Sequence, residues 1–179
     1  SSYFPRSAFL KILEKKFHGS ENIFIGTTGN LSREMYSLMP NTKNFYMAGN
    51  MGGALSLGLG VAKAGKNVIV CGGDAEFVMH MGGLTSTGRY ANEINLTYIL
   101  FDNEQNKSTG GQNTYQGHLN YIKIAESSGL KCHQDVIYEI EVFNKLIDSP
   151  RGLNFFHVKC GLDDEYPRPH LENIKINNI

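Results

Sequence analysis

The stretch VIVCGGDAEFVMHMGG, residues 68–83, decides the fold and the search for a functional site. It opens with a continuous apolar run, which is typical of a strand buried on both faces of a sheet. The run ends in a Gly-Gly-Asp turn, and a segment rich in Met, His and Gly follows. Asp74 therefore stands at the end of a buried strand, where it can cap a helix, hold a metal ion, or do both.

Strand-like and helix-like segments alternate along the rest of the chain. The apolar pattern predicts strands over residues 22–26, 43–47, 67–73, 95–101 and 153–160. It predicts helices over residues 5–17, 31–39, 51–64, 121–129 and 138–149. The glycines of the segment 51–64 should let that helix pack closely on the sheet. We expect a single α/β domain over residues 1–179, a three-layer α/β/α sandwich with a mainly parallel sheet, and a loosely structured tail over residues 162–179.

Charge, hydropathy and cysteine content narrow the classes of function. Lys plus Arg and Asp plus Glu each number 17, and no basic block is present, which argues against a nucleic acid partner. No apolar run approaches the roughly 20 residues of a membrane span, and no leader pattern opens the chain. Three widely spaced cysteines argue against a disulfide framework and a Cys-based zinc site. We expect a soluble protein of the reducing cytoplasm.

The loops after the predicted strands share a composition that suits a polar ligand. These loops, rich in Gly, Thr, Asn and Asp, are residues 26–30, 47–53, 71–76 and 102–117. In a parallel sheet they meet at the carboxyl edge, where small residues let backbone N–H groups approach phosphate oxygens. Asn103 follows Asp74 by 29 residues, close to the length of about 30 residues of a βαβ unit, so both should emerge from nearby strands. Their oxygens suit Mg²⁺ bound together with a phosphate group.

Five stretches together resemble the diphosphate-binding, C-terminal half of thiamine-diphosphate-dependent decarboxylases of the phosphonopyruvate and sulfopyruvate type. The metal motif of that family is Gly-Asp-Gly followed at a distance by Asn-Asn, and this chain has Gly73-Asp74-Ala75 and then Asp102-Asn103. The other stretches are TTGNLSRE (27–34), GNMGGALSLGLGVA (49–62), HMGGL (80–84) and STGGQ (108–112). The resemblance implies a thiamine-diphosphate-binding fold and the cofactors thiamine diphosphate and Mg²⁺. It also implies decarboxylation of a small anionic 2-oxo acid, phosphonopyruvate to phosphonoacetaldehyde and carbon dioxide, or alternatively sulfopyruvate.

The resemblance also assigns roles to single residues. It makes Asp74, Asn103 and the backbone carbonyl of Gln105 the protein ligands of Mg²⁺. Met51 matches the apolar residue that holds the cofactor in its bent shape. The residues implied to contact the cofactor are Thr27, Thr28, Gly29, Gly49, Asn50, Met51, Gly73, Asp74, Ala75, Glu76, Asn103, Gln105, Ser108 and Thr109.

Three departures from the family pattern bear on the site. Ala75 replaces the second Gly of the metal motif, and because a positive φ would strain an alanine, we expect an ordinary backbone conformation there. Asp102 replaces the first Asn of the pair and adds a negative charge near the expected metal. Asn106 and Lys107 stand where phosphonopyruvate decarboxylases often carry a His-Asp pair, which leaves the choice of substrate open.

The activating glutamate of this family lies in its other, pyrimidine-binding half. Glu14 and Glu21 lie in no matching context, so no catalytic residue is assigned in this chain. The resemblance therefore implies a partner, a pyrimidine-binding domain or subunit, and a homo- or hetero-oligomer. His118 and Arg168 are candidates to face the substrate, and Arg168 equally suits a solvated tail. A non-catalytic half-domain that binds a diphosphate ligand or a partner enzyme is the alternative.

Overall fold

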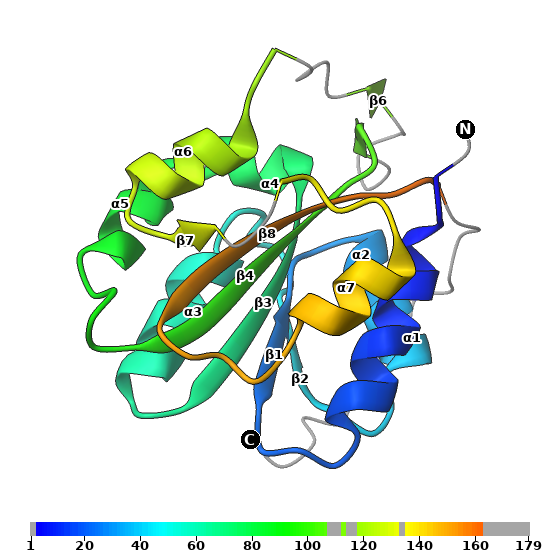
Figure 1. Ribbon diagram of the computed structural model, residues 1–179, viewed down its shortest axis with the longest axis horizontal. Helices are drawn as coiled ribbons and strands as arrows, with labels where there is room; N and C mark the ends of the chain where they lie inside the picture. The colour runs from blue at the N-terminus through cyan, green and yellow to red at the C-terminus, as the bar shows by residue number, and fades with distance from the viewer. Residues whose placement is uncertain (1–2, 107–111, 114–117, 133–134, 163–179) are drawn as a thin grey trace.

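The computed structural model describes residues 3–106, 112–113, 118–132 and 135–162. Six parallel strands form one sheet in the order β2-β1-β3-β4-β8-β7 (Figure 1). These strands are β1 (Ile23–Gly26), β2 (Lys43–Tyr46), β3 (Asn67–Gly73), β4 (Asn95–Asp102), β7 (Lys131–Cys132) and β8 (Leu153–Lys159). A separate antiparallel pair consists of β5 (Gln105–Asn106) and β6 (Gln112–Asn113). The predicted parallel sheet is confirmed.

Helices cover both faces of this sheet (Figure 1). The helices on one face are α1 (Arg6–Phe17), α2 (Asn30–Leu38) and α7 (Ile140–Leu146). Those on the other face are α3 (Ala54–Lys63), α5 (Gly82–Gly88) and α6 (Tyr121–Ser127). The short helix α4 (Asp74–Met79) follows β3 at the carboxyl edge of the sheet. The three-layer α/β/α sandwich is therefore confirmed.

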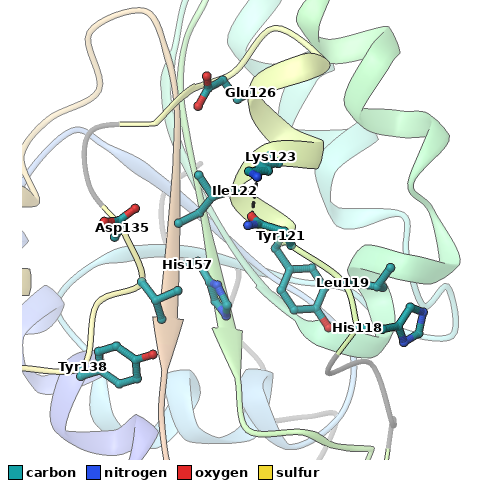
Figure 2. Close-up of a pocket in the computed structure, with 11 residues that line it drawn as sticks. His118, Leu119, Tyr121, Ile122, Lys123, Glu126, Asp135, Tyr138 and His157 are labelled. Atoms are coloured by element: carbon teal, nitrogen blue, oxygen red, sulfur yellow. Dashed lines mark hydrogen bonds between the residues drawn. The ribbon is translucent and has the colours of Figure 1, made fainter.

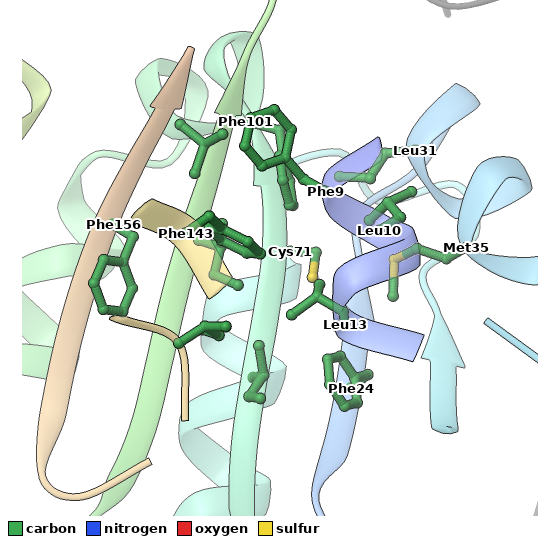
Figure 3. Close-up of a cluster of buried hydrophobic side chains, with 14 of the residues drawn as sticks. Phe9, Leu10, Leu13, Phe24, Leu31, Met35, Cys71, Phe101, Phe143 and Phe156 are labelled. Carbon is green, nitrogen blue, oxygen red and sulfur yellow. The ribbon is translucent and has the colours of Figure 1, made fainter. Parts of the chain in front are cut away.

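Each face of the sheet has its own hydrophobic core, because successive residues of a strand point to opposite faces. Phe101 of β4 packs in the core under α1 and α7, where the rings of Phe9 and Phe143 meet edge to face at 5.4 Å (Figure 3). Tyr98, on the opposite face of β4, meets the ring of Phe155 edge to face at 5.7 Å. This burial on both faces explains why the strands read as continuous apolar runs rather than alternating ones.

The largest departures from the predicted elements lie in three places, and in addition the helix predicted over residues 51–64 begins only at Ala54. The segment after Gly73 forms two short helices, α4 and α5, which the sequence pattern did not separate. The helix predicted over residues 138–149 is shorter, because Ile137 bridges to Val158 of β8 and the chain stays extended through Glu139. β5, β6 and β7 have two residues each, too few to show a period. The predicted loose tail, apart from Leu162, lies outside the described residues.

All three cysteines are free, and both Cys71 and Cys160 are buried, so the expected lack of disulfides is confirmed. Within the part of the chain that the structure describes, no helix has the length and apolar character needed to cross a bilayer.

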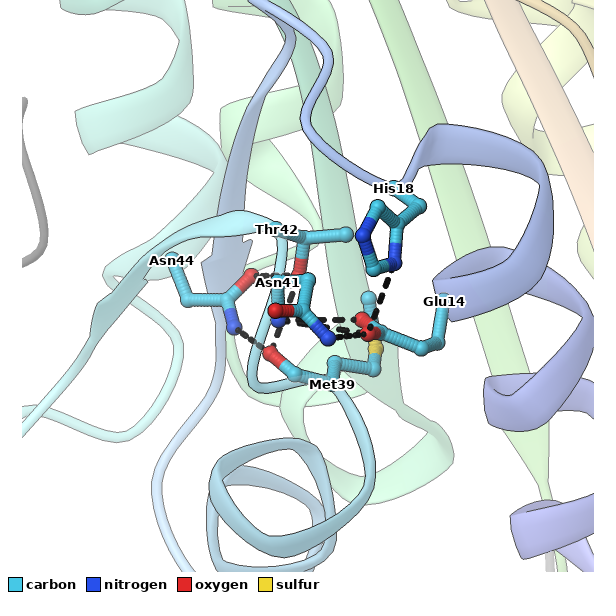
Figure 4. A network of polar contacts seen from close by, with 6 residues as sticks. All are labelled: Glu14, His18, Met39, Asn41, Thr42 and Asn44. Carbon is cyan, nitrogen blue, oxygen red and sulfur yellow. Dashed lines mark hydrogen bonds and ion pairs between the residues drawn. The ribbon is translucent and has the colours of Figure 1, made fainter.

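The amino edge of the sheet is held by polar contacts around the start of β2. Glu14 accepts hydrogen bonds from the backbone and side-chain nitrogens of Asn41 at 3.2 and 2.6 Å, and lies 3.6 Å from His18 (Figure 4). Glu21 pairs with Lys43, the first residue of β2, at 2.6 Å. Both glutamates therefore lie at the edge opposite to the loops that follow the strands.

Candidate functional site

The strand order places a topological switch point, where ligand crevices form in open α/β sheets, at the carboxyl ends of β1 and β3. The chain runs from β1 outward to β2 and returns to β3 on the other side of β1, which makes this pair a topological switch point. Thr27 follows β1 and Asp74 follows β3, and both are buried, with 5% and 2% of their surface exposed. The amide of Thr27 donates to the carbonyl of Cys71 at 3.0 Å and so ties the start of the loop after β1 to the last part of β3.

Asp74 is the first residue of α4, and Gly73 occupies the capping position without any side-chain contact. The interpretation of Asp74 as a helix cap is therefore wrong. Its buried carboxyl group lies instead in the first turn, where the helix dipole favours an anion. Ala75 lies within α4, and Glu104 is the one non-glycine residue with positive φ in the described ranges. The expected ordinary backbone of Ala75 is confirmed, so its replacement of Gly causes no strain.

Asn103 follows β4, which is the direct neighbour of β3 in the sheet. Gly73 pairs with Phe101 in the parallel register, so Asp74 and Asn103 leave the sheet at the same edge of adjacent strands. The predicted proximity of these two chain positions is confirmed. Gln105 follows Asn103 by two residues and is the first residue of β5. A carboxylate, a side-chain amide and a backbone carbonyl thus occur along one short stretch of the edge.

Glu76 carries a buried carboxyl group without a hydrogen-bond partner. Its exposed fraction is 4%, and neither of its side-chain oxygens is bonded within the described structure. Burial raises the pKa of Glu76 to about 8, and the nearby amide of Ala54, at the start of α3, offsets only part of this effect. The group is therefore mostly protonated at neutral pH and adds little negative charge. Such a neutral group is compatible with an anionic diphosphate near α4.

The loop before α3 packs against the end of α4. Gly52 has a φ of +94°, and a Cβ atom at this position would lie 2.3 Å from Cδ2 of His80. A larger residue therefore fits neither the backbone nor the space. Gly49 and Asn50 are exposed at this edge and Met51 is half-buried. The structure brings the stretches GNMGG and HMGGL into contact, although they are far apart in the sequence.

The TTGN stretch forms the turn between β1 and α2. Gly29 has a φ of +89°, a conformation that favours glycine, and immediately precedes the helix. Ser32 in the first turn of α2 donates a hydrogen bond to the carbonyl of Thr27. The hydroxyl of Thr28 is buried without a partner among the described residues. This orphaned polar atom beside the switch point is consistent with a ligand contact at that place.

Sequence reasoning missed two residues of β8 that hold Asp102. Nε2 of His157 lies 2.9 Å from Oδ2 of Asp102, and Nζ of Lys159 lies 3.4 Å from the same oxygen. Burial alone would raise the pKa of Asp102, but the hydrogen bond from His157 and the charge of Lys159 outweigh burial and lower the pKa. Asp102 therefore carries a negative charge that Lys159 offsets in part. His157 and Lys159 share one face of a predicted strand, but only the strand order shows that they face Asp102.

A cavity of about 590 Å³ lies beside His157, between α6 and β8 (Figure 2). His118, Tyr121 and His157 line it, and the rings of Tyr121 and His157 meet edge to face at 5.0 Å. His118 lies three residues before the start of α6, is exposed, and lines this cavity (Figure 2). Charged side chains of both signs, including Lys123 and Asp135, complete the lining.

Some expected positions cannot be placed. Ser108, Thr109 and Arg168 lie outside the described residues, and Gln105 is described by its backbone alone. Among the residues that the structure does describe, no group of three or more His, Cys, Asp and Glu side chains could hold a metal ion. The expected Mg²⁺ ligands are one carboxylate, one side-chain amide and one backbone carbonyl, so they do not form a group of that type.

Comparisons with known proteins agree with the fold and the motifs. Residues 25–148 match the family model described as thiamine pyrophosphate enzyme, C-terminal TPP binding domain. The sulfopyruvate decarboxylase subunit beta of Methanococcus maripaludis is 30% identical over 183 residues, which cover 97% of this chain and 90% of that protein. The same subunit of Methanocaldococcus jannaschii is 39% identical over 63% of this chain and 60% of that protein. The phosphonopyruvate decarboxylase of Streptomyces viridochromogenes is 38% identical over 60% of this chain, but only 27% of that longer protein is covered.

Solved structures share the fold at lower sequence identity. The thiamine diphosphate-dependent 4-hydroxybenzoylformate decarboxylase of Rhodococcus jostii RHA1 superposes with a TM-score of 0.72 at 17% identity, covering 91% of this chain and 34% of that one. The benzoylformate decarboxylase of Polynucleobacter necessarius gives a TM-score of 0.69 at 16% identity, covering 93% and 34%. The family match over residues 25–148 and the relative matched over 90% of its length lead to one conclusion. The chain belongs to the C-terminal TPP-binding domain family of thiamine pyrophosphate enzymes.

Proposed function

We propose that this chain supplies the diphosphate- and Mg²⁺-binding half of a thiamine-diphosphate-dependent decarboxylase that acts on a small anionic 2-oxo acid. The observation that carries the proposal is the position of Asp74 and Asn103 at the carboxyl ends of two adjacent strands. The relatives named phosphonopyruvate and sulfopyruvate decarboxylases support the reaction class. Thiamine diphosphate, when bound, supplies the electron sink for the electron pair released as carbon dioxide leaves.

Each group at the edge has a proposed part in holding the cofactor. The side chains of Asp74 and Asn103 and the carbonyl of Gln105 offer oxygen ligands to Mg²⁺, which fills its remaining positions with phosphate oxygens and water. Half-buried Met51, in the loop before α3, would support the cofactor. The buried carboxyl of Glu76, two residues from Asp74 in α4, is proposed to lie near the diphosphate. Ser108 and Thr109 are proposed to lie near the diphosphate.

The substitution Asp74→Ala tests the metal assignment. Isothermal titration of the full chain with Mn²⁺, used in place of Mg²⁺, and inorganic diphosphate should show metal-dependent binding by the wild type. Asp74→Ala should abolish this binding, because it removes the one charged ligand of the proposed set.

Asp148→Ala is the matched control, because it removes an exposed carboxylate ahead of β8, at the amino edge. The control should bind like the wild type. Wild-type affinity in Asp74→Ala would exclude Asp74 as a metal ligand.

Two substrates fit the proposed reaction, since phosphonate and sulfonate groups are both tetrahedral anions. Phosphonopyruvate, which would give phosphonoacetaldehyde and carbon dioxide, is our main proposal, and the phosphonopyruvate decarboxylase of Streptomyces viridochromogenes supports it at 38% identity. One observation favours sulfopyruvate: a relative named as a separate beta subunit of sulfopyruvate decarboxylase matches over 90% of its own length. His118, at the cavity beside α6, and Arg168 are proposed to face the substrate.

The proposed enzyme includes a pyrimidine-binding domain or subunit and acts as a homo- or hetero-oligomer. The relatives named as beta subunits support the need for a partner. The free cysteines support a reducing compartment, and we place the enzyme in the cytoplasm. A non-catalytic half-domain that binds a diphosphate ligand or a partner enzyme remains the second candidate, favoured by Asp102 in place of the usual Asn.

A further inference from the structure

The carboxylate of Asp102 is committed to three donors of the chain itself. Oδ1 accepts the backbone N–H of Glu104 at 3.1 Å. Oδ2 lies 2.9 Å from Nε2 of His157 and 3.4 Å from Nζ of Lys159. A carboxylate only accepts, so the nitrogen of His157 carries the proton in this contact. Since Asp102 is 4% exposed, these contacts are shielded from water and leave its oxygens little freedom to turn elsewhere.

The same contacts shape the turn that contains Asn103. Glu104 has a φ of +58°, an unfavourable conformation for a non-glycine residue that the surrounding structure must hold. The carboxylate of Asp102 binds the amide of Glu104 across Asn103, and Nζ of Lys159 lies 2.5 Å from Oε1 of Glu104. The carbonyl of Asp102 accepts the amide of Cys160 at 3.0 Å. Both ends of the turn are therefore fastened to β8 and the residue after it.

We infer that Asp102, His157 and Lys159 are positioning residues that fix the turn of residues 102–105, so that Asn103 and the carbonyl of Gln105 are presented to the metal ion. This inference rests on the proposed function. Asp102 acts through the backbone rather than as a ligand, because its oxygens already bind protein donors. The cation of Lys159 lies against both Asp102 and Glu104, so it offsets part of the negative charge that Asp102 adds at this edge.

The chemistry of the three contacts predicts different results for two substitutions of Asp102. Asp102→Ala removes the acceptor for the amide of Glu104, releases the turn, and should weaken binding of Mn²⁺ with inorganic diphosphate roughly 10- to 100-fold, as is typical when groups that orient metal ligands are lost. Asp102→Asn keeps one oxygen for that amide but turns its NH2 group toward His157 and Lys159, so it loses the hydrogen bond from His157 and the contact with Lys159. Its affinity should therefore lie between those of the wild type and Asp102→Ala.

A local measurement separates positioning from general loss of stability. In the full chain without metal, hydrogen exchange of the Glu104 amide, followed by NMR, should be faster in Asp102→Ala and stay protected in Asp102→Asn. Phe155→Leu is the control, because Phe155 is buried on the same face of β8 and makes no hydrogen bond to the turn. It should lower the free energy of unfolding while leaving both the Glu104 amide and the affinity unchanged.

Lys159→Met provides a second test if Asp102→Ala does not fold. It cuts the contacts from Lys159 to Asp102 and Glu104 but leaves His157 in place, so a smaller loss of affinity is expected. Unchanged affinity in Lys159→Met and in any folded Asp102→Ala, while Asp74→Ala abolishes binding, would overturn the positioning role alone. Lack of binding by the wild type would overturn the proposed function, and the role toward the metal with it.

Discussion

At the scale of single residues, Glu76 links the stability of the chain to pH. Its pKa is about 8 in the folded chain, against an ordinary value of 4.5. Between these values the folded state keeps a proton that the unfolded state releases. The free energy of unfolding should therefore fall as pH rises through this window, by up to about 1.4 kcal/mol per pH unit. Urea denaturation at several pH values, with EDTA and without cofactor, measures this slope.

Glu76→Gln keeps the shape of the side chain and removes the titrating group. The variant should be more stable than the wild type at pH 8, and the difference should shrink as the pH falls toward 5. Glu93→Gln, at an exposed carboxyl group before β4, is the control and should follow the wild type. Parallel pH profiles for Glu76→Gln and the wild type would contradict the buried, protonated state.

Residue type and spacing were enough to select Asp74 and Asn103, because a parallel sheet brings the carboxyl ends of its strands together. They were not enough to show the protonation state and the contacts of each carboxyl group at this edge. The protonation of Glu76 depends on burial, and the lowered pKa of Asp102 depends on contacts with β8, which is more than fifty residues away in the chain. The capping role expected of Asp74 failed because the helix begins one residue earlier than a cap would require.

At the scale of elements, the two glycines in the middle of α3 predict opposite effects of the same substitution. A Cβ atom on Gly58 would lie 2.6 Å from Cγ2 of Val70 in β3, whereas one on Gly60 would meet nothing within 4 Å. Gly60→Ala should stabilise the chain by about 0.5–1 kcal/mol through helix propensity. Gly58→Ala gains the same propensity but should destabilise the chain by about 1–3 kcal/mol through overpacking.

Thermal or urea unfolding of the two variants measures the difference, and each serves as the control of the other. Equal stability of the two variants would show that α3 can shift away from the sheet at no cost. The sequence-based expectation that glycines allow close packing of this helix is confirmed at Gly58, but Gly60 faces outward and has no such role.

Long elements with a clear period were predictable, and short ones were not. The strands over residues 67–73 and 95–101 and the helix over 5–17 differ from the observed elements by at most one residue at an end. The split of residues 74–88 into α4 and α5 has no periodic signature, since each helix makes only about two turns. β7 owes its existence to pairing with β8, which no local pattern reveals.

At the scale of the whole molecule, the distribution of acidic groups explains why a partner is proposed. Glu14 and Glu21 form contacts at the amino edge. At the carboxyl edge, Asp102 and Glu104 pair with Lys159, and Glu76 is buried. We assign none of these acidic groups to activation of a pyrimidine ring, so the chain by itself should form an incomplete site.

The full chain with thiamine diphosphate and Mg²⁺ should therefore release no carbon dioxide from phosphonopyruvate or sulfopyruvate. Addition of a separately produced pyrimidine-binding half from a phosphonopyruvate or sulfopyruvate decarboxylase should restore release, measured as carbon dioxide evolved. That half alone is the control. The acid with the larger kcat/KM identifies the substrate, and absence of release from both acids, despite binding of Mn²⁺ with diphosphate, would favour the non-catalytic role.

The common direction of the six strands has a practical consequence for handling the protein. Every loop proposed to touch a ligand leaves one edge of the sheet, while the turns around Lys66 and Asn92 leave the other. Both residues are exposed. A tether to a sensor chip or resin at Lys66 or Asn92 would orient the molecule with its ligand-facing edge toward the solution. Immobilisation through the amino edge would leave the ligand-facing edge open for a second protein to bind.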